Sequence, residues 1–471
     1  MILRLPVVVG VVWFAAFVVA HAQPEMVLDI NPGPAGLPLP LGQVRDEQLF
    51  FQALHPDSGT EIWVSDGTAA NTVLAAEFIP GPTGSGARVL GIDKGLVYVS
   101  AANANGNLEL WSISSPAFPA TAYQGITSPN WLGNVGGRLL VSATSPTVQN
   151  EVFWADAVGG PQLWVDVNGS SLTSAPCCLI PTGPNSALLS ARASSDPIIS
   201  SAPHWLIEDS ATEIRSSAGN KVSPRGVFRP VENGYFFFGT EDAGFDSLGT
   251  EPWLIDFLGS QATLIDDLNP GGESSGALAY PISLTYKGEV YFAADTPGRG
   301  LEVWKSNGVG AQLVGDFAPG EDGSDPIAFL EYREELYFGV RTRGGPQLWK
   351  TDGASTTLVA SLGSNPNFEA PWPVAVVDGH LLFRVETEAH GQELWVTNGR
   401  AGRVAMVSDI NPGAADGIGR PIAWEINPSR LLFVADDGVH GPELWRLGAG
   451  YLDSLLPLFA DSFECDSPLC P

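Results

Sequence analysis

The sequence is poor in positive charge. Of its 471 residues, 23 are Lys or Arg and 52 are Asp or Glu, which gives a net charge of −29. Nucleic-acid binding depends on clustered Lys and Arg that release counterions from phosphates, and this sequence has no basic run or stripe. The composition therefore predicts that nucleic acid is not a partner. It also disfavours direct docking on anionic lipid.

Long apolar runs are also scarce. The one clear example extends from Leu5 to Ala20, follows the positive charge of Arg4, and leads into Ala20-His21-Ala22. This is the pattern of a secretory signal peptide with an A-x-A cleavage site, and the stretch is short against the roughly 20 residues that span a bilayer. We expect residues 1–22 to be a signal peptide and the mature chain to begin at Gln23, without a membrane span.

Catalytic signatures are missing as well. The sequence predicts no nucleophile elbow of the G-x-S-x-G type, and it contains no G-x-x-x-x-G-K-[ST] phosphate loop and no H-E-x-x-H pair. Glycoside hydrolysis or lysis stays open, because hydrolysis requires only two carboxylates about 5–10 Å apart, and the chain has many acids. We predict no catalytic residue, and an enzyme is the less favoured interpretation.

Cysteine occurs only as two pairs. Cys177 and Cys178 are adjacent, whereas Cys465 and Cys470 lie near the C-terminus. An even number of cysteines in an exported protein suggests disulfides, and we expect Cys465 and Cys470 to close a small loop. For Cys177 and Cys178 three alternatives are open: a strained vicinal bond, two reduced thiols, or pairing with another chain. The spacing of the four cysteines matches no recognised zinc site.

What the sequence does contain is an internal repeat. Segments such as GTEIWVSDGT, LEVWKSNG and GQELWVTNG recur with a mean spacing of (445 − 63)/8, or about 48 residues. In the third unit, which is the weakest, a Phe takes the position of the Trp. The nine marker positions are Trp63, Trp111, Phe153, Trp205, Trp253, Trp304, Trp349, Trp395 and Trp445.

Each unit is predicted to contain four short strands. In the sixth unit these are ALAYPISLTY, EVYFAA, LEVWKS and AQLVGDF, which are rich in strand-forming residues and are separated by glycine-bearing turns. A DG or NG follows the third strand, as at Asp352-Gly353, and suits a tight hairpin. A PG follows the fourth strand, as at Pro319-Gly320, and ends the pairing because Pro cannot donate to a ladder.

A four-stranded meander with this repeat length is typical of the blades of an all-β propeller. Residues 26–33, MVLDINPG, match the fourth strand of other units, whereas the ninth unit ends at its third strand. We therefore expect the N-terminal strand to complete the last blade and close the ring. The predicted division is residues 1–22 as signal peptide, 23–450 as a propeller of nine blades, and 451–471 as a tail. Eight blades with an insertion, or an open solenoid, are the alternatives.

At these residues the sequence resembles the bacterial family known for its ELWxxDGT repeat. The match covers most of residues 26–447, and it departs from the pattern at Phe153, at Pro203-His204-Trp205 and at Gln347. The resemblance implies an exported bacterial repeat protein without an assigned activity, and it brings no catalytic residues. The tail LFADSFECDSPLCP also resembles a short C-terminal F-x-D-G-F-E segment of exported Gram-negative proteins, with Ser462 in place of the Gly.

A glutamate stands two positions before the marker in seven of the nine units. On a strand such a Glu shares a face with the marker residue. One interpretation is a ring of carboxylates that binds cations. The favoured one is structural, in which each Glu accepts hydrogen bonds from a neighbouring loop and fixes the packing of its blade. The residues are Glu61, Glu109, Glu151, Glu251, Glu302, Glu393 and Glu443.

Loops between second and third strands carry acids and glycines, and Ca²⁺ is the one metal that such oxygen-rich turns suggest. None has EF-hand spacing, and hairpin turns use the same residues, so we expect no cofactor. His390 and His440 occupy equivalent loop positions in successive units and could form a metal-binding or pH-sensitive pair, but duplication of one turn is the favoured explanation. The loops are residues 55–61, 241–251, 295–302 and 435–443.

Trp131, Trp372 and Trp424 lie outside the marker positions. An exposed Trp can stack on sugar rings, but Trp372 and Trp424 are expected to pack within first strands, and Trp131 is left open. We predict an exported binding scaffold that recognises a polysaccharide or an envelope or extracellular protein through loops on one face. A purely structural surface protein is a further alternative. The predicted location is the medium, the periplasm or the cell surface of a Gram-negative bacterium.

Overall fold

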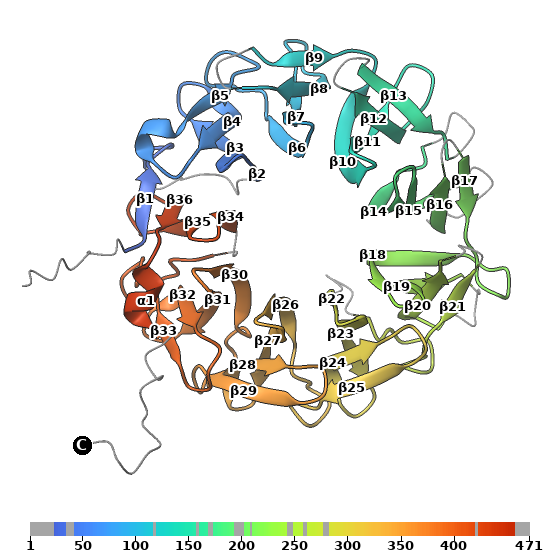
Figure 1. Cartoon of the computed structure of the whole chain (residues 1–471), viewed down its shortest axis with the longest axis vertical. Coiled ribbons are helices and arrows are strands. Elements are labelled where there is room, and N and C mark those ends of the chain that lie inside the picture. The colour runs from blue at the N-terminus through green and yellow to red at the C-terminus, as the bar shows by residue number, and fades with distance from the viewer. Residues whose placement is uncertain are drawn as a thin grey trace, which may run out of the picture.

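The computed structural model describes residues 23–33, 42–115, 119–156, 160–167, 173–192, 202–207, 210–242, 248–257, 261–276, 282–419 and 423–456. These residues form nine four-stranded antiparallel sheets arranged in a ring (Figure 1). The predicted fold, a propeller of nine blades, is confirmed, and the alternatives of eight blades and of an open solenoid are wrong. The expected signal peptide and the expected Cys465–Cys470 bond lie outside the described residues.

The blades follow one another along the chain, each with its strands in sequence order except at the ring closure. The first three blades are β2 (Gly42–Arg45), β3 (Gln48–His55), β4 (Gly59–Ser65), β5 (Val73–Ala76); β6 (Arg88–Asp93), β7 (Leu96–Ala102), β8 (Leu108–Ile113), β9 (Thr121–Tyr123); and β10 (Thr127–Val135), β11 (Arg138–Thr144), β12 (Glu151–Asp156), β13 (Gly160–Val165). Blades four to six are β14 (Cys177–Gly183), β15 (Ser186–Ala191), β16 (Ala202–Ile207), β17 (Ser210–Glu213); β18 (Val222–Val231), β19 (Gly234–Glu241), β20 (Thr250–Asp256), β21 (Ala262–Leu264); and β22 (Ser283–Tyr286), β23 (Glu289–Thr296), β24 (Gly300–Ser306), β25 (Ala311–Gly315). Blades seven to nine are β26 (Ile327–Tyr332), β27 (Glu335–Thr342), β28 (Gly345–Thr351), β29 (Thr356–Ser361); β30 (Trp372–Val377), β31 (His380–Thr387), β32 (Gly391–Thr397), β33 (Val404–Met406); and β34 (Ala423–Asn427), β35 (Arg430–Asp436), β36 (Pro442–Leu447), β1 (Glu25–Leu28).

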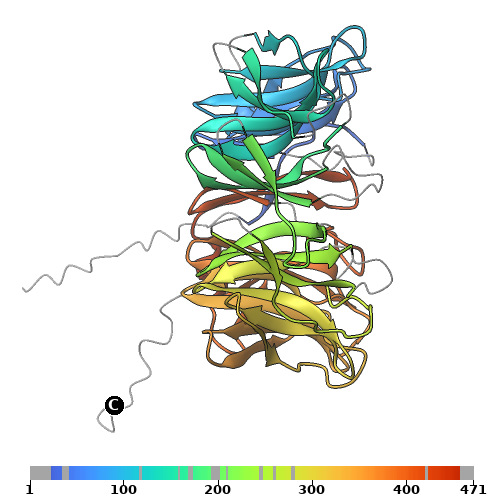
Figure 2. The same ribbon diagram turned by 90° about the vertical axis from the view of Figure 1, so that its right-hand side faces the viewer.

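The first strand of each blade lies at the inside of the ring and the fourth at the outside (Figure 1). Second strands carry continuous apolar runs such as Leu49-Phe50-Phe51, because neighbouring blades cover both of their faces. The DG or NG turn after the third strand places a glycine at positive φ, as at Gly353 (φ 99°). Seen from its edge in Figure 2, the ring is much thinner than it is wide.

Each marker residue is a third-strand residue that pairs with the second strand of its own blade. The same register holds in the third unit, where Phe153 takes the marker position. Marker and partner are Trp63 and Phe51, Trp111 and Val99, Phe153 and Val141, Trp205 and Leu188, Trp253 and Phe237, Trp304 and Phe292, Trp349 and Phe338, Trp395 and Phe383, and Trp445 and Phe433.

The hydrophobic core is divided among the interfaces between blades. Nine clusters of buried side chains connect successive blades, and one of them joins blade nine to blade one through Leu432, Leu49 and Phe51. A row of nine blades has eight internal interfaces, so the ninth cluster means that the ring is closed. Val27 and Ile30 of the N-terminal segment belong to this closing cluster.

The N-terminal strand β1 supplies the fourth strand of blade nine. It pairs antiparallel with β36, with Met26 opposite Trp445. The last blade is therefore built from both ends of the described chain, and the pairing covers the edge of β36 that would otherwise be open. The sequence match of residues 26–33 to other fourth strands predicted this closure.

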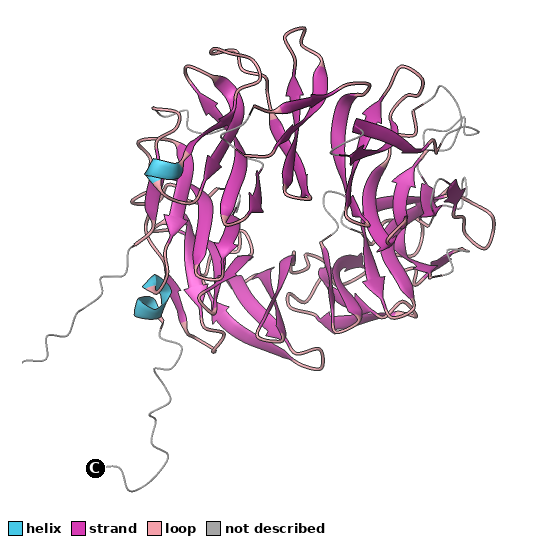
Figure 3. Cartoon of the chain, turned by 45° about the horizontal axis from the view of Figure 1, so that its top comes forward, coloured by secondary structure: helices cyan, strands magenta, loops and turns pink. Residues whose placement is uncertain are grey.

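Among the residues that the structure describes, helical structure is confined to a 3-10 turn at Ala69–Asn71 and the helix α1 (Tyr451–Leu455), both at the outer part of the ring near β1 (Figure 3). No helical periodicity predicted α1, because a single turn is too short to show a period. Tyr451 and Leu452 are buried, and the Tyr451 hydroxyl donates to the Val407 carbonyl (2.9 Å). The described start of the predicted tail thus packs on blades eight and nine. Within the described residues, no helix is long and apolar enough to cross a membrane.

Candidate binding face

Six of the seven repeat glutamates are fully buried near the start of the third strand. In blade six, the Glu302 carboxylate accepts hydrogen bonds from the backbone N–H groups of Phe317 (3.1 Å) and Ala318 (3.0 Å). It also accepts one from the Ser324 hydroxyl (2.6 Å). All three donors lie in the connection from blade six to blade seven, so the carboxylate ties one blade to the entry of the next. Serine partners occur at Glu61 and Ser85, Glu151 and Ser174, Glu251 and Ser275, and Glu302 and Ser324.

The last two buried glutamates use backbone donors. Glu393 accepts from the N–H groups of Ile410 and Asn411, both at 3.1 Å, and Glu443 accepts from the closing segment through Ile30 N–H and Asn31 N–H, both at 3.2 Å. Each carboxylate accepts hydrogen bonds from internal donors and is shielded from solvent, although Oε2 of Glu393 has no partner, and this argues for the structural interpretation over a ring of cation ligands.

Burial shifts the titration of these groups. Loss of solvation raises the pKa of Glu151, Glu393 and Glu443 to about 7, although the hydrogen bonds that each carboxylate accepts act in the opposite direction. The pKa values of Glu61, Glu251 and Glu302 are raised for the same reason. The fold therefore prefers these side chains protonated relative to the unfolded chain.

Three blades depart from this pattern, and in blade four Pro203 takes the place of Glu. Glu109 is only half-buried, and its carboxylate accepts from the Asn103 side-chain amide (2.6 Å). In blade seven Gln347 takes the place of Glu, and its Oε1 atom accepts from the Trp349 indole N–H (2.9 Å). Neither contact joins one blade to the next.

The serines that donate to the buried glutamates were not identified from the sequence. One of them, Ser275, lies in a G-x-S-x-G motif that the sequence prediction also overlooked. Residues 272–276 read G-E-S-S-G, which has the G-x-S-x-G spacing. They lie in the connection between two strands, β21 and β22, and do not follow directly on a strand as the serine of a nucleophile elbow does. The Ser274 hydroxyl accepts from Thr250 N–H (3.0 Å), and the Ser275 hydroxyl donates to Glu251 (2.6 Å). Both serines have structural partners.

The equivalent histidines do not form a pair. Nδ1 of His390 lies 3.0 Å from the Asp409 carboxylate, whereas Nδ1 of His440 lies 2.7 Å from that of Asp437. The Asp437 carboxylate raises the pKa of His440. Each His thus has its own acid. Across the part of the chain that the structure describes, no three His, Cys, Asp or Glu side chains come together in a way that could hold a metal ion, and this search includes the described parts of the four acidic loops.

Trp131, Trp372 and Trp424 all lie on first strands, but their exposure differs. Trp424 is half-buried, packs on the core between blades nine and one, and donates from its indole to Gly42 (3.2 Å). Trp131 on β10 is 53% exposed and Trp372 on β30 is 36% exposed. Trp372 therefore lies within a first strand, as expected, but keeps part of its ring at the surface.

Trp372 is held in place by Arg384 of the next strand. The guanidinium lies 5.8 Å from the centre of the indole ring and is itself nearly buried. It donates to the Gln392 side chain and the Gly419 carbonyl, both at 2.8 Å, and forms an ion pair with Glu369. Because Arg384 has four partners, the indole is presented on a fixed support.

Three adjoining cavities form a groove across blades six, seven and eight, which we call the blade 6–8 groove. Their volumes are about 490, 290 and 200 Å³. Asp322 lines the first and second, Arg341 the second and third, and Asp325 the first and third, so the cavities lie next to one another. They lie on the face that carries the loops between second and third strands and the connections between blades.

The lining of the blade 6–8 groove changes along its length. The end at blade six is acidic, the middle has Arg343 and Asn367, and the end at blade eight has Trp372. Ion pairs join Arg343 to Asp322 (3.3 Å) and Arg341 to Asp325. The groove thus combines an aromatic surface with polar groups of both charges. Its acidic residues at the blade-six end are Glu273, Asp295, Glu321, Asp322 and Asp325.

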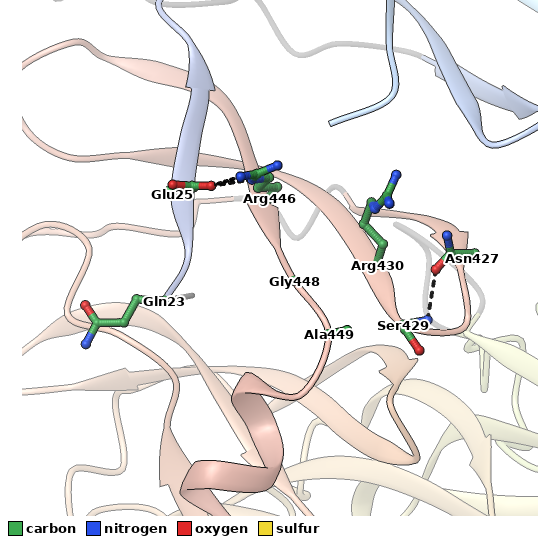
Figure 4. Close-up of a pocket in the computed structure, with 8 residues that line it drawn as sticks. All are labelled: Gln23, Glu25, Asn427, Ser429, Arg430, Arg446, Gly448 and Ala449. Carbon is green, nitrogen blue, oxygen red and sulfur yellow. Dashed lines mark hydrogen bonds and ion pairs between the residues drawn. The ribbon is translucent and has the colours of Figure 1, made fainter. Parts of the chain in front are cut away.

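A fourth cavity, of about 440 Å³, lies where the ring closes (Figure 4). Arg446 forms an ion pair with Glu25 of β1 and donates to the Gly67 carbonyl (3.1 Å), while Arg430 donates to the Asp66 carbonyl (3.0 Å). These bonds join blade nine to the DG turn of blade one.

Equivalent hydrogen bonds occur at an interface between two successive blades. In blade six, Lys287 and Lys305 donate to the carbonyls of Asp352 and Gly353 in the DG turn of blade seven, each at 3.0 Å. The contacts around the closure cavity are therefore those of an ordinary blade interface, and we assign this cavity to the ring closure.

Comparison with known proteins gives no family. No protein-family model and no curated protein matches the sequence. Solved structures with a similar fold include a puromycin-hydrolyzing peptidase of Mycobacterium tuberculosis (12% identity, TM-score 0.37, 90% of this chain and 62% of that chain). A second is the BP39L lectin of Burkholderia pseudomallei (12% identity, TM-score 0.38, 76% of this chain and 94% of that chain). A third is the β-propeller domain of the Trilobed protease of Pyrococcus furiosus (11% identity, TM-score 0.36, 80% of this chain and 98% of that chain). The chain thus spans less than two thirds of the peptidase, and no conclusion about function follows from scores this low.

Proposed function

We propose that this propeller is an exported binding scaffold that recognises a polysaccharide through the blade 6–8 groove. The observation that carries the proposal is the row of three adjoining cavities that ends at a partly exposed, firmly supported Trp372. A polymer of sugars needs an extended site, an aromatic face on which a ring can stack, and side chains that hydrogen-bond hydroxyl groups.

The groups along the groove suit this ligand. Arg343, Asn367 and Thr342 line its middle and offer donors and acceptors, and the rigid blades beneath hold the loops in place. The half-buried ion pair of Arg341 with Asp325 restricts the arginine side chain before a ligand arrives, which lowers the entropy cost of binding. A protein partner, which the sequence leaves open, would find the same groups but would not require the stacking face.

The competing function is that of a glycoside hydrolase or a polysaccharide lyase. Asp325 and Glu369 line the same 200 Å³ cavity, which brings two carboxylates together at the Trp372 end. Their side chains are 40% and 60% exposed, and each is paired with an arginine, Arg341 or Arg384. A catalytic carboxyl must be free to contact the reacting atoms, and here an arginine engages each of the two carboxylates. These pairings favour binding over catalysis.

The test is retention of the protein in gels that contain neutral or acidic polysaccharides. Trp372→Ala should weaken retention by the best ligand about tenfold, which corresponds to about 1.4 kcal/mol. Trp131→Ala is the matched control, because Trp131 is a more exposed first-strand tryptophan on blade three, away from the groove. Equal retention of the wild-type protein and both variants would remove the groove from the proposal.

A further inference from the structure

The adjacent cysteines of blade four are placed unusually. Side chains of successive residues on a regular strand point to opposite faces, which would separate two adjacent thiols. Here the Sγ atoms of Cys177 and Cys178 lie only 2.9 Å apart at the start of β14. Both cysteines are unbonded and neither is fully buried.

The backbone explains this approach. Cys178 has a φ of +59°, in the left-handed region that non-glycine residues seldom adopt, and the pairing of β14 with β15 shifts register between Cys177 and Ile180. The irregularity breaks the alternation of the strand and turns the two thiols toward each other. Strained backbone of this kind persists only where the surrounding structure holds it.

We propose that Cys177 and Cys178 are a covalent modification site, at which a disulfide co-reactant converts the two thiols into a vicinal disulfide. The Cys177 thiolate attacks one sulfur of the co-reactant, whose S–S bond breaks, and one thiolate leaves with the electron pair. Cys178 then loses its proton to water and attacks the Cys177 sulfur, which expels the second thiolate. The two cysteines are oxidised, and the co-reactant is reduced to two thiols.

The chemistry of the pair fits this order of steps. The neighbouring Cys178 thiol lowers the pKa of Cys177 to about 7, whereas the pKa of Cys178 is raised. Cys177 is also the more exposed of the two, so it is the sulfur that meets the co-reactant first. Adjacent Cα atoms are about 3.8 Å apart, below the usual range of disulfides, so the bond should also be readily reduced.

The experiment uses the full chain with Cys465→Ser and Cys470→Ser, so that only the blade-four pair can react. The reduced protein is treated with oxidised glutathione, alkylated with iodoacetamide and analysed by peptide mass. We expect the peptide that carries residues 177–178 to lose two hydrogen atoms, to carry neither glutathione nor alkyl groups, and to regain both thiols with dithiothreitol.

Further substitution of Cys177→Ser or Cys178→Ser should trap a stable mixed disulfide with glutathione on the remaining cysteine. Three results would overturn the proposal in the protein that retains both cysteines: two alkylated thiols, glutathione retained on the peptide, or a dimer on a non-reducing gel. The wild-type pair gives the decisive result, so a folding defect in a serine variant would not obscure it.

Discussion

The contact between Glu302 and Ser324 allows a quantitative test of how one blade is tied to the next. Glu302→Ala removes the acceptor of three donors, which are two backbone N–H groups and the serine hydroxyl. A buried donor without a partner costs about 1–3 kcal/mol, and removal of a desolvated carboxylate recovers part of this cost. We therefore expect Glu302→Ala to lower the free energy of unfolding by about 4 kcal/mol, measured by urea denaturation followed by tryptophan fluorescence.

Glu109→Ala is the matched control, because Glu109 has the same repeat position but is only half-buried and contacts a side-chain amide. It should cost less than about 1 kcal/mol. Ser324→Ala should cost about 1 kcal/mol, and the double variant Glu302→Ala/Ser324→Ala should cost less than the sum of the single changes, because both remove the same bond. Equal losses at Glu302 and Glu109, or strict additivity of the pair, would refute the assigned role of the buried carboxylates.

Three further predictions follow from the fold. Burial raises the pKa of carboxyls such as Glu393 to about 7 from an ordinary value of 4.5, so the folded chain binds more protons than the unfolded chain between these two values. The melting temperature should therefore fall as the pH rises from 5 through 8. Glu393→Gln should flatten that dependence in a pH series of thermal melts. Ile30→Ala should lower the free energy of unfolding in urea by about 2–4 kcal/mol, because Ile30 is buried in the closing cluster although it lies near the start of the described chain. Val73→Ala, at an exposed position, should be nearly neutral. A small effect of Ile30→Ala would contradict the closure. Gly417→Ala should destabilise the fold by about 1–3 kcal/mol in the same assay, because the added Cβ would lie 2.1 Å from Glu393 Oε1. Gly419→Ala has open space around its Cβ and should have no effect. Equal free energies of unfolding for the two variants would show that the carboxylate can move away.

The repeat allowed most of the fold to be predicted from the sequence. The spacing of the markers fixed nine units, and the match of residues 26–33 to other fourth strands identified the closing strand. Both features depend on local sequence that recurs, which is why they can be recognised without coordinates. The single-turn helix α1 could not be predicted, since its stability comes from burial of Tyr451 and Leu452 against other blades.

The candidate site was much less predictable. The serine partners of the buried glutamates lie 22–24 positions further along the chain, in the connection to the next blade. A recurrent serine after the PG turn, in GSG, SSG and GSD, was the signal that could have found them. No such signal existed for the blade 6–8 groove. Its residues come from several loops that only the ring brings together, and the exposure of Trp372 depends on Arg384 and on neighbouring connections.

The most direct test of the proposed function is to incubate the purified protein with a panel of bacterial and host polysaccharides, while both retention of the protein and release of new reducing ends are followed. We predict retention by at least one polysaccharide without release, and weaker retention of Trp372→Ala. Release of reducing ends would contradict a binding scaffold and favour the enzyme. Absence of both signals, with or without Ca²⁺, would contradict carbohydrate recognition and point to a protein partner or a structural role.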